Sequence, residues 1–221
     1  MVTNKQRAYV DIKQRIIREE FTPGQWLIER ELSEMYGLSR TPMREILRNL
    51  VSDGLLELQP AKGYTVRKLS IEEVSQIFRA REAVEGLVAR LACQRRGEEF
   101  MRSLGEIKKR LRRVDPKQDA AQGVSIGNDL HNLIIETADN FLLNQFYQKL
   151  KNLAGLTRNI TKQSSSIEKE SQQAHLSIIE AIEEGDPDKA EQRMREHLRT
   201  TCRLLLDAFH KDLYPPNTLR T

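Results

Sequence analysis

The chain is poor in the features that mark disulfide-linked, secreted and membrane-spanning proteins. Its 221 residues include two cysteines, Cys93 and Cys202, and each lies inside a helical pattern. Two buried, reduced thiols are therefore expected rather than a disulfide framework. No apolar run approaches the roughly 18–20 residues that cross a bilayer, and the first residues lack the apolar core of a signal peptide. We expect a cytoplasmic protein without membrane association.

Excess charge of one sign is also small. Lys and Arg number 36 against 32 Asp and Glu, which gives a net charge of +4. Residues 1–69 carry 12 basic and 9 acidic residues, whereas the rest of the chain carries 24 and 23. An excess in the N-terminal third is compatible with nucleic-acid binding. It is weak support alone, because many enzymes with no nucleic-acid partner are equally basic.

Residues 29–52 are the most informative stretch, because they have the pattern of two short helices joined by a tight turn. Gly37 is suited to end the first helix. Ser39 or Thr41 can cap the second, and Pro42 falls in its first turn, where a missing N–H costs nothing. A helix that begins with Ser, Arg and Thr suits contacts with phosphates and base edges in a DNA major groove.

The flanking residues complete a larger unit. Apolar residues recur at helical spacing over residues 5–19, and residues 27–28 follow as a short extended piece. Residues 55–58 and 64–67 have the pattern of two strands joined by a polar, Gly-containing tip. Three helices and a hairpin predict a winged helix-turn-helix domain over residues 1–69.

The pattern is helical from Leu69 onward. Helices are expected at about 71–94, 98–114, 118–137, 141–161, 166–184 and 187–211. The predicted fold is therefore mainly α, with an N-terminal winged helix-turn-helix and a C-terminal all-helical bundle of about six helices. Residues 70–214 would form the second domain and residues 215–221 a tail.

Three arginines of the second short helix make a candidate DNA-reading surface. Arg40, Arg44 and Arg48 follow at i, i+4 and i+8, so they share one face of the helix. An arginine can bind guanine O6 and N7 through its two-pronged guanidinium group. The alternative is a solvated face whose arginines pair with Glu45 and neighbouring acids.

Further candidates lie around this helix. The hydroxyl groups of Ser39 and Thr41 can donate to phosphate. Arg30 opens the preceding helix, where it can also reach phosphate. Lys62, at the hairpin tip, can reach the adjacent minor groove or backbone.

The first domain contains a series of motifs over about residues 8–68. They are Pro23-Gly24, Arg30-Glu31-Leu32-Ser33, Ser39-Arg40-Thr41-Pro42-Met43-Arg44-Glu45-Ile46-Leu47, Gly54-Leu55 and Gly63. In this order they resemble the GntR family of bacterial transcription regulators, with Met43 and Ile46 as conservative departures at packing positions. The resemblance implies that Arg30, Ser39, Arg40, Thr41, Arg44 and Gly63 contact DNA.

Three histidines lie in three different predicted helices. His131, His175 and His197 each sit in an amphipathic pattern. Imidazoles from three helices of a bundle can converge on one divalent ion such as Zn²⁺ or Ni²⁺. A histidine flanked by leucine is, however, more often a partly buried side chain with no ligand, and spacing this long is no metal signature.

The helical half contains a second series of motifs. They are Arg81-Glu82-Ala83-Val84-Glu85, His131 with Asp139-Asn140, His175 before Ile178-Ile179-Glu180-Ala181-Ile182, and His197 after Asp186-Pro187 and Ala190. By these residues the helical half is similar to the FCD effector domain of FadR-type regulators. Many such domains hold a divalent metal with three histidines and an aspartate four residues before the first. The resemblance thus implies a metal on His131, His175 and His197.

The aspartate of that pattern is missing. Gly127 stands four residues before His131, and Asp129, two residues before it, would face about 160° away on a regular helix. Water or effector oxygens would complete the shell, unless a distorted helix turns Asp129 inward. A metal with open positions attracts an oxyanion, which makes a small carboxylate the expected effector. Arg81 is a candidate carboxylate partner, or else an i, i+4 ion-pair partner of Glu85.

The sequence thus predicts a ligand-responsive transcription regulator. As a homodimer it would bind a pseudo-palindromic double-stranded operator, with a small carboxylate in a metal-containing pocket changing its affinity for DNA. Repression is the family's common mode. Two alternatives are a metal-dependent helical enzyme and a non-specific DNA-architectural protein. No general base is placed by a motif, so we expect no enzyme.

Overall fold

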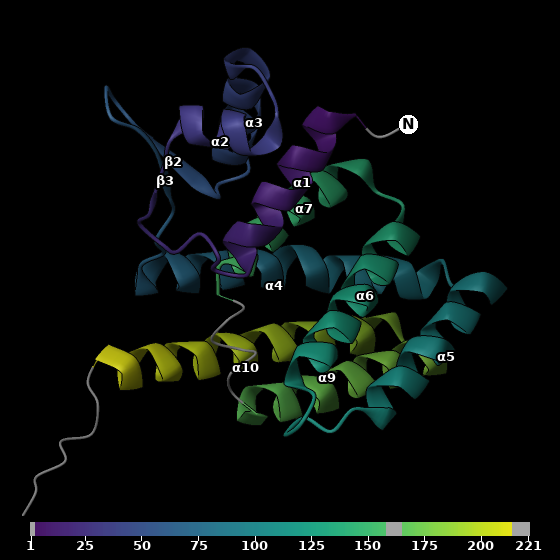
Figure 1. Cartoon of the computed structure of the whole chain (residues 1–221). Coiled ribbons are helices and arrows are strands. Elements are labelled where there is room, and N and C mark those ends of the chain that lie inside the picture. Colours follow the sequence, from purple (N-terminus) through teal and green to yellow (C-terminus); the bar gives the residue numbers. More distant parts are fainter. Residues whose placement is uncertain (1–2, 158–164, 214–221) are drawn as a thin grey trace, which may run out of the picture. The chain divides into compact units, whose positions relative to one another are not determined.

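The computed structural model describes residues 3–157 and 165–213 of the chain (Figure 1). These residues divide into two compact units. Residues 3–70 and 151–157 form the first, which we call the winged unit. Residues 71–150 and 165–213 form the second, the helical unit. The predicted tail at 215–221 lies outside the described residues.

The winged unit has the predicted order of three helices and a hairpin. Its elements are α1 (Asn4–Ile17), β1 (Trp26–Leu27), α2 (Glu29–Tyr36), α3 (Arg40–Ser52), β2 (Leu56–Gln59) and β3 (Gly63–Val66). The strands form an antiparallel sheet in the order β1-β3-β2, and Thr65 of β3 lies opposite both Trp26 and Glu57. The predicted winged helix-turn-helix is confirmed. The short extended piece, expected at 27–28, is the third strand of its sheet.

The core of the winged unit follows from helical spacing. Ile12 and Ile16 of α1 and Ile46, Leu47 and Leu50 of α3 are at most 1% exposed. Each set recurs every three to four residues, so it lines one face of its helix. Met35, which the pattern of α2 places inward, is instead 56% exposed.

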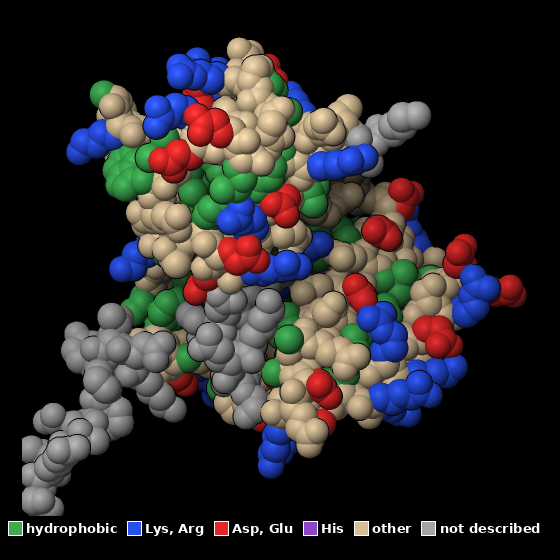
Figure 2. Space-filling view, viewed as in Figure 1, with side chains coloured by type: hydrophobic (Ala, Val, Ile, Leu, Met, Phe, Trp, Pro, Cys, Tyr) green, Lys and Arg blue, Asp and Glu red, His purple; other side chains and the backbone are tan. Residues whose placement is uncertain are grey.

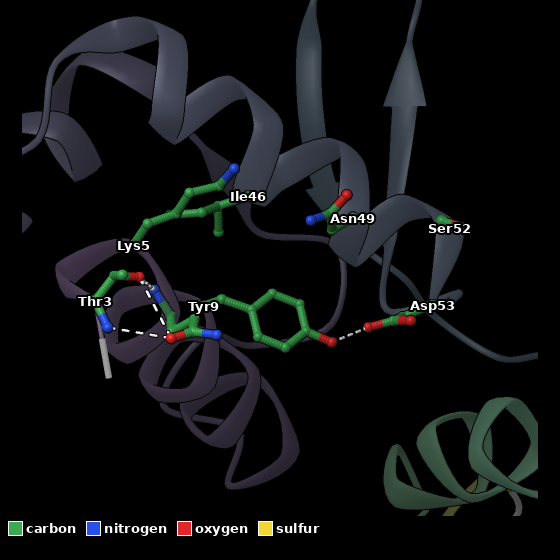
Figure 3. Close-up of a pocket in the computed structure, with 8 residues that line it drawn as sticks. Thr3, Lys5, Tyr9, Ile46, Asn49, Ser52 and Asp53 are labelled. Carbon is green, nitrogen blue, oxygen red and sulfur yellow. Dashed lines mark hydrogen bonds between the residues drawn. The ribbon is translucent and has the colours of Figure 1, made fainter. Parts of the chain in front are cut away.

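Local chemistry sets the ends of these helices. Thr3 and Gln6 form a capping box at the start of α1. Gly37 follows α2 with φ +61°, in the left-handed region that glycine adopts without strain. The hydroxyl of Tyr9 donates to Asp53, the residue that follows α3, and so joins α1 to α3 (Figure 3). These contacts fix the position of α3.

Six helices follow Ser70 within the described residues, as predicted; five lie wholly in the helical unit, and the last residues of the fourth belong to the winged unit. They are α4 (Ile71–Gln94), α5 (Glu98–Arg113), α6 (Ala120–Ala138), α7 (Phe141–Gly155), α9 (Ser165–Glu184) and α10 (Pro187–Leu213). Helix α10 packs on α4 and α9, and α6 packs on α4, α5 and α9. The predicted helix 141–161 ends early, at Gly155, and its last predicted residues lie outside the described range.

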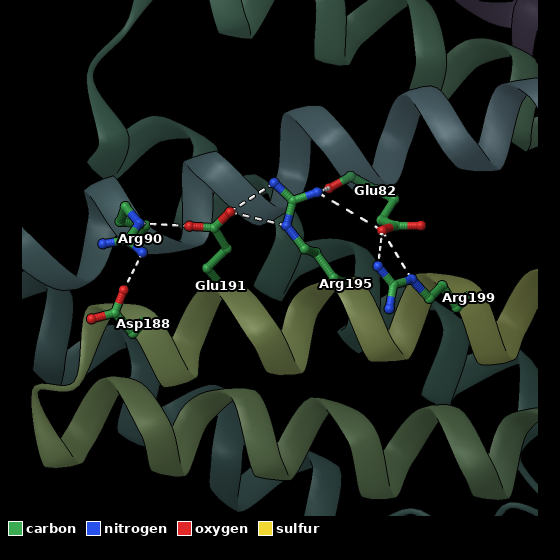
Figure 4. Close-up of polar contacts among 6 residues, drawn as sticks. All are labelled: Glu82, Arg90, Asp188, Glu191, Arg195 and Arg199. Carbon is green, nitrogen blue, oxygen red and sulfur yellow. Dashed lines mark hydrogen bonds and ion pairs between the residues drawn. The ribbon is translucent and has the colours of Figure 1, made fainter.

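A ladder of ion pairs joins α4 to α10 (Figure 4). Glu191 accepts from Arg90 of α4 and from Arg195 of its own helix, and Glu82 accepts from Arg199. A Cβ atom at Gly86 would lie 2.8 Å from Cγ of Arg195, so a glycine at this point leaves room for that arginine. The ladder fixes the register of the two helices over the stretch of α10 that contains His197.

Two expectations about burial have different outcomes. Cys93 is buried as predicted, whereas Cys202 is only half-buried because it lies in a groove between α4 and α10. Both thiols are free. Among the described residues, none of the helices has the length and apolar character needed to cross a membrane.

Candidate DNA-binding interface and metal centre

The turn between α2 and α3 brings together three of the predicted DNA contacts. Arg30, Ser39 and Arg40 line one open hollow of about 480 Å³. All three are exposed, as are Thr41 and Arg44 on the next turn of α3. Basic side chains gather over α2, α3 and the hairpin, with acidic ones between them (Figure 2). The structure therefore places these residues on one solvent-facing side of the winged unit.

The start of α3 suits an anion. Ser39 is its N-cap residue, with φ −70° and ψ 164°, yet its side chain makes no capping hydrogen bond. The first N–H groups of a helix have no partner within the helix and carry partial positive charge. Because the Ser39 hydroxyl does not satisfy them, these groups are available to a phosphate oxygen.

The arginine stripe is only partly engaged by acidic residues. Arg44 donates two hydrogen bonds of 2.9 Å to the Glu29 carboxylate. Glu45, the partner that the solvated-face alternative named, pairs with Lys5 instead. The alternative, which named Glu45 and neighbouring acids, is thus right that an acidic residue pairs with the stripe, and for Arg44 that acid is Glu29.

The hairpin tip has a backbone that requires glycine. Gly63 has φ +107°, and Ala61 precedes it at φ +60°. A residue with a side chain would be strained at φ +107°, so Gly63 allows the tight tip that holds Lys62 exposed.

The three predicted histidines converge in the helical unit. His131 of α6, His175 of α9 and His197 of α10 are 5–6% exposed, and one ring nitrogen from each lies within 4.8 Å of the others. The Nε2 atoms of His131 and His175 are 3.2 Å apart. Ligand atoms about 2.1 Å from a shared ion lie roughly 3.0–3.4 Å from each other, so the separation of this pair suits a shared ion as well as a hydrogen bond between the two rings.

The protonation states also fit a metal. Burial, together with the nearby charge of His131, holds the pKa of His175 well below its usual value. Burial and the neighbouring histidines do the same for the pKa of His197. Neutral imidazole is the form that binds a metal. Within the described residues, Nδ1 of His175 and Nδ1 of His197 have no hydrogen-bond partner, so each ring has a buried nitrogen that a ligand could satisfy.

Glu85 of α4 supports the cluster from outside. One of its carboxylate oxygens lies 2.5 Å from Nδ1 of His131, and the other accepts a 2.7 Å hydrogen bond from Arg81. Burial alone would raise the pKa of Glu85, but Arg81 and His131 outweigh it and hold that pKa at about 2. A carboxylate at Nδ1 leaves Nε2 of His131 free to bind a metal.

The predicted i, i+4 ion pair of Arg81 is thus present. Arg81 is 14% exposed at its side chain and its Nε atom donates to Glu85, a residue of its own helix. The other interpretation, in which Arg81 binds the effector carboxylate, requires it to do so while it holds Glu85. It stays a prediction.

The structure shows why an aspartate does not fit at position 127. A Cβ atom at Gly127 would lie 2.4 Å from Cε1 of His175, so the His175 ring occupies the space of a side chain at this position. Asp129 is not turned inward, because it pairs with Arg110 at 2.8 Å and is 44% exposed at its side chain. No aspartate of α6 therefore joins the three histidines.

The sequence did not predict that two acidic residues of the helical unit are buried in its core. Glu85 was noted only as a partner of Arg81. Glu168 of α9 is 2% exposed, although it lies in the polar stretch Ser166-Ile167-Glu168-Lys169-Glu170. Its burial depends on the absence of a side chain at Gly123 of α6, and no local pattern signals such an approach between helices.

Comparisons with known proteins agree with both units. Residues 4–66 match the family of bacterial regulatory proteins of the gntR type, and residues 76–200 match the FCD domain. The HTH-type transcriptional repressor RspR of Escherichia coli K12 is 27% identical over 88% of this chain and 85% of its own length. The repressor GlaR of the same strain is 27% identical over 91% of this chain and 95% of its own.

A solved structure shares the fold. E. coli McbR/YncC superposes with a TM-score of 0.81 at 22% identity, over 95% of this chain and all of that one. The matched family and the similar proteins are transcription regulators, which are not enzymes. This confirms the prediction that the chain is not an enzyme, and the alternative of a metal-dependent enzyme is dropped. The chain belongs to the GntR family of bacterial regulatory proteins, and its helical unit is an FCD domain.

Proposed function

We propose that this regulator is a FadR-type, ligand-responsive repressor that binds a pseudo-palindromic operator as a homodimer. The observation that carries the proposal is the exposed group at the α2–α3 turn, where Arg30, Ser39 and Arg40 line one hollow at the start of the recognition helix α3. Repression is favoured because RspR and GlaR are named as repressors.

The exposed residues have separate roles. Arg40 and Arg44 would read base edges in the major groove, because a guanidinium group can bind both acceptors of guanine. Arg30, Ser39 and Thr41 would hold phosphates and so set the position of α3. Lys62, on the tip that Gly63 allows, would reach the adjacent groove. Arg44 would exchange its two hydrogen bonds with Glu29 for contacts to DNA.

Dimerisation follows from the geometry of this type of recognition. One α3 helix contacts only a few base pairs, and a two-fold dimer presents two such helices to half-sites one helical turn or a multiple apart. The resulting operator has an inverted repeat. A cytoplasmic location is part of the same proposal.

The helical unit would sense the effector. His131, His175 and His197 are proposed to hold a divalent ion, Zn²⁺ or Ni²⁺, through one ring nitrogen each. When bound, the ion supplies positive charge and open positions to which a carboxylate oxygen can bind. Glu85 fixes the His131 ring. The effector changes the affinity for DNA only to the extent that it binds the two states of the dimer unequally.

The test is a selection of genomic fragments by the purified protein, followed by affinity measurements at a fixed salt concentration. We expect a few fragments that carry an inverted repeat and bind at least about 10³-fold more tightly than random duplex. Arg40→Ala should weaken this binding by about 1–3 kcal/mol. Arg102→Ala, an exposed arginine of α5, is the matched control and should change nothing.

A second candidate, a non-specific DNA-architectural protein, is tested by the same data. Its affinity would depend steeply on salt and would be nearly the same for selected and random duplex. That result would contradict the repressor, whereas a large difference between the two duplexes would exclude the architectural role.

A further inference from the structure

Glu168 is a buried carboxyl group without a described partner. It lies on α9 and is 2% exposed, and its Oε1 atom makes no hydrogen bond within the described part of the chain. A buried polar group without a partner is costly, and most such groups in folded proteins are satisfied by protein, water or ligand. Burial raises the pKa of this carboxyl to about 7. Among the described residues, therefore, none supplies a hydrogen bond to Oε1 of Glu168.

The position of Glu168 relates it to the histidine cluster. A Cβ atom at Gly123 would lie 2.0 Å from Glu168 Oε1, and one at Gly127 would lie 2.4 Å from His175 Cε1. Gly123 and Gly127 are one turn apart on α6, where Cβ positions are about 5–6 Å from each other. The carboxyl of Glu168 is therefore roughly one helical turn from the His175 ring.

The spacing of the residues along α6 and α9 agrees with this separation. Gly123, Gly127 and His131 follow at i, i+4 and i+8 on α6, so they share one face. Glu168 and His175 are seven residues apart on α9 and share the facing side. The α6–α9 interface thus has two polar levels, with His131 and His175 at one, where His197 of α10 joins them, and Glu168 at the next.

We infer that Glu168 is the second anchor of the effector and that the effector is a short carboxylic acid with a hydroxyl or ammonium group at its far end. The inference rests on the proposed function, in which the carboxylate of the effector binds at the histidines. A chain of three or four carbons spans the step from that level to Glu168, whose oxygen accepts a hydrogen bond from the far group.

This arrangement discriminates against simple fatty acids. An alkyl end next to Glu168 would leave Oε1 buried and unpaired, which is the kind of mismatch that gives strong selectivity. An effector with a donor satisfies that oxygen. Glu168 would thus determine specificity, while the histidines supply the common attraction for carboxylates.

The test uses pairs of acids that have the same shape. Zinc-loaded protein is titrated calorimetrically with 3-hydroxypropionate and with butyrate, then with 4-hydroxybutyrate and with pentanoate. In each pair a methyl group replaces the terminal hydroxyl. We expect the wild-type protein to bind the better hydroxy acid about 10-fold or more tightly than its partner.

Variants then assign the preference to the residue. Glu168→Leu should remove the preference and leave binding of the plain acid unchanged or tighter. Glu168→Gln keeps an accepting oxygen and the side-chain shape, so it should retain most of the preference even if the leucine variant folds poorly. Glu180→Gln, an exposed glutamate of the same helix, is the matched control and should behave as wild type.

The outcomes separate this inference from the function on which it rests. Equal affinities in both pairs for wild type, or a preference that persists in Glu168→Leu, would overturn the role of Glu168 and leave the carboxylate effector intact. If no acid binds the zinc-loaded wild type, the carboxylate effector itself is wrong, and the role of Glu168 falls with it.

Discussion

The two units of this protein place the side chains of their candidate sites in opposite environments. In the winged unit, Arg30, Arg40 and Lys62 project into solvent, and the one strong ion pair of the predicted contact residues, Arg44 with Glu29, is on the surface. In the helical unit, Glu85, Glu168 and the three histidines are at most 6% exposed. Exposed charges suit a long, flexible anion such as DNA, whereas buried ones select a small ligand by shape and by hydrogen bonds.

Burial also determines how much each group contributes to stability. Exposed ion pairs are worth about 0–1 kcal/mol because water screens them. A buried pair that loses one member leaves the other charge unpaired in a medium of low polarity, which costs several kcal/mol. Substitutions of the buried acids Glu85 and Glu168 should therefore have large effects, whereas substitution of the surface acid Glu29 should have a small one. The following predictions test this contrast in decreasing order of effect.

Glu85→Gln should have the largest effect. It removes the charge that pairs with Arg81, whose side chain is 14% exposed, and we expect a loss of about 3–5 kcal/mol of unfolding free energy in metal-free protein. Chemical denaturation measures it. Affinity for zinc should fall about 10–100-fold as well, because the carboxylate at Nδ1 of His131 is lost. A variant with unchanged stability would show that the pair contributes nothing in solution.

Glu168→Gln should remove a dependence of stability on pH. The folded pKa of Glu168, about 7, lies above its value of 4.5 in the unfolded chain, so the folded state holds this proton more tightly. Its contribution to stability is fully present below pH 4.5 and is lost as the pH rises through about 7. The glutamine variant should gain up to about 3 kcal/mol over wild type between pH 5 and pH 8.

Denaturation of both metal-free proteins across this pH range measures the difference. Groups common to the two proteins, among them the buried histidines, cancel in it. A constant difference from pH 5 to pH 8 would mean that Glu168 titrates as an exposed residue does.

Gly127→Ala should cost about 1–3 kcal/mol, because the added Cβ would lie 2.4 Å from His175 Cε1 and the ring would have to move. Zinc affinity should fall with it. Gly105→Ala is the matched control, since no atom lies within 4 Å of a Cβ at this helical position, and it should be neutral or slightly stabilising. Equal effects of the two substitutions would contradict the close approach of α6 and α9.

Glu29→Gln should have the smallest effect on stability, below about 1 kcal/mol, because Arg44 is 53% exposed at its side chain. The same substitution should increase the affinity for DNA, because Arg44 would no longer have to leave the Glu29 carboxylate before it contacts DNA. We expect slightly tighter binding to random duplex, measured by fluorescence anisotropy. Weaker binding would indicate that Glu29 orients Arg44 for DNA.

The sequence was sufficient for those parts of the protein that depend on local pattern. Ile12 and Ile16 repeat at helical spacing, Gly37 ends α2, and Gly63 sits in the hairpin tip, so the winged unit could be predicted nearly element by element. The prediction that Met35 points into the core was wrong, because an eight-residue helix has too few turns to define a buried face. The three histidines were found because each interrupts an apolar helical face.

The supporting acids could not be predicted, because their roles depend on how closely helices approach. Glu85 lies on α4 and His131 on α6, 46 residues apart in the chain, and no spacing rule joins them. Glu168 is buried only because Gly123 leaves space for its carboxyl. A glycine within a helix is compatible with many packings, so its partner is known only once the helices are placed.

The claim that most separates the two units is that the buried histidines hold a metal, and the most direct measurement is metal content by plasma mass spectrometry. Wild type and the triple variant His131→Ala, His175→Ala, His197→Ala are purified side by side, with Arg102→Ala as control. The account predicts about one divalent ion per chain in wild type and control and none in the triple variant. No bound metal in wild type, even after incubation with Zn²⁺ or Ni²⁺, would contradict it.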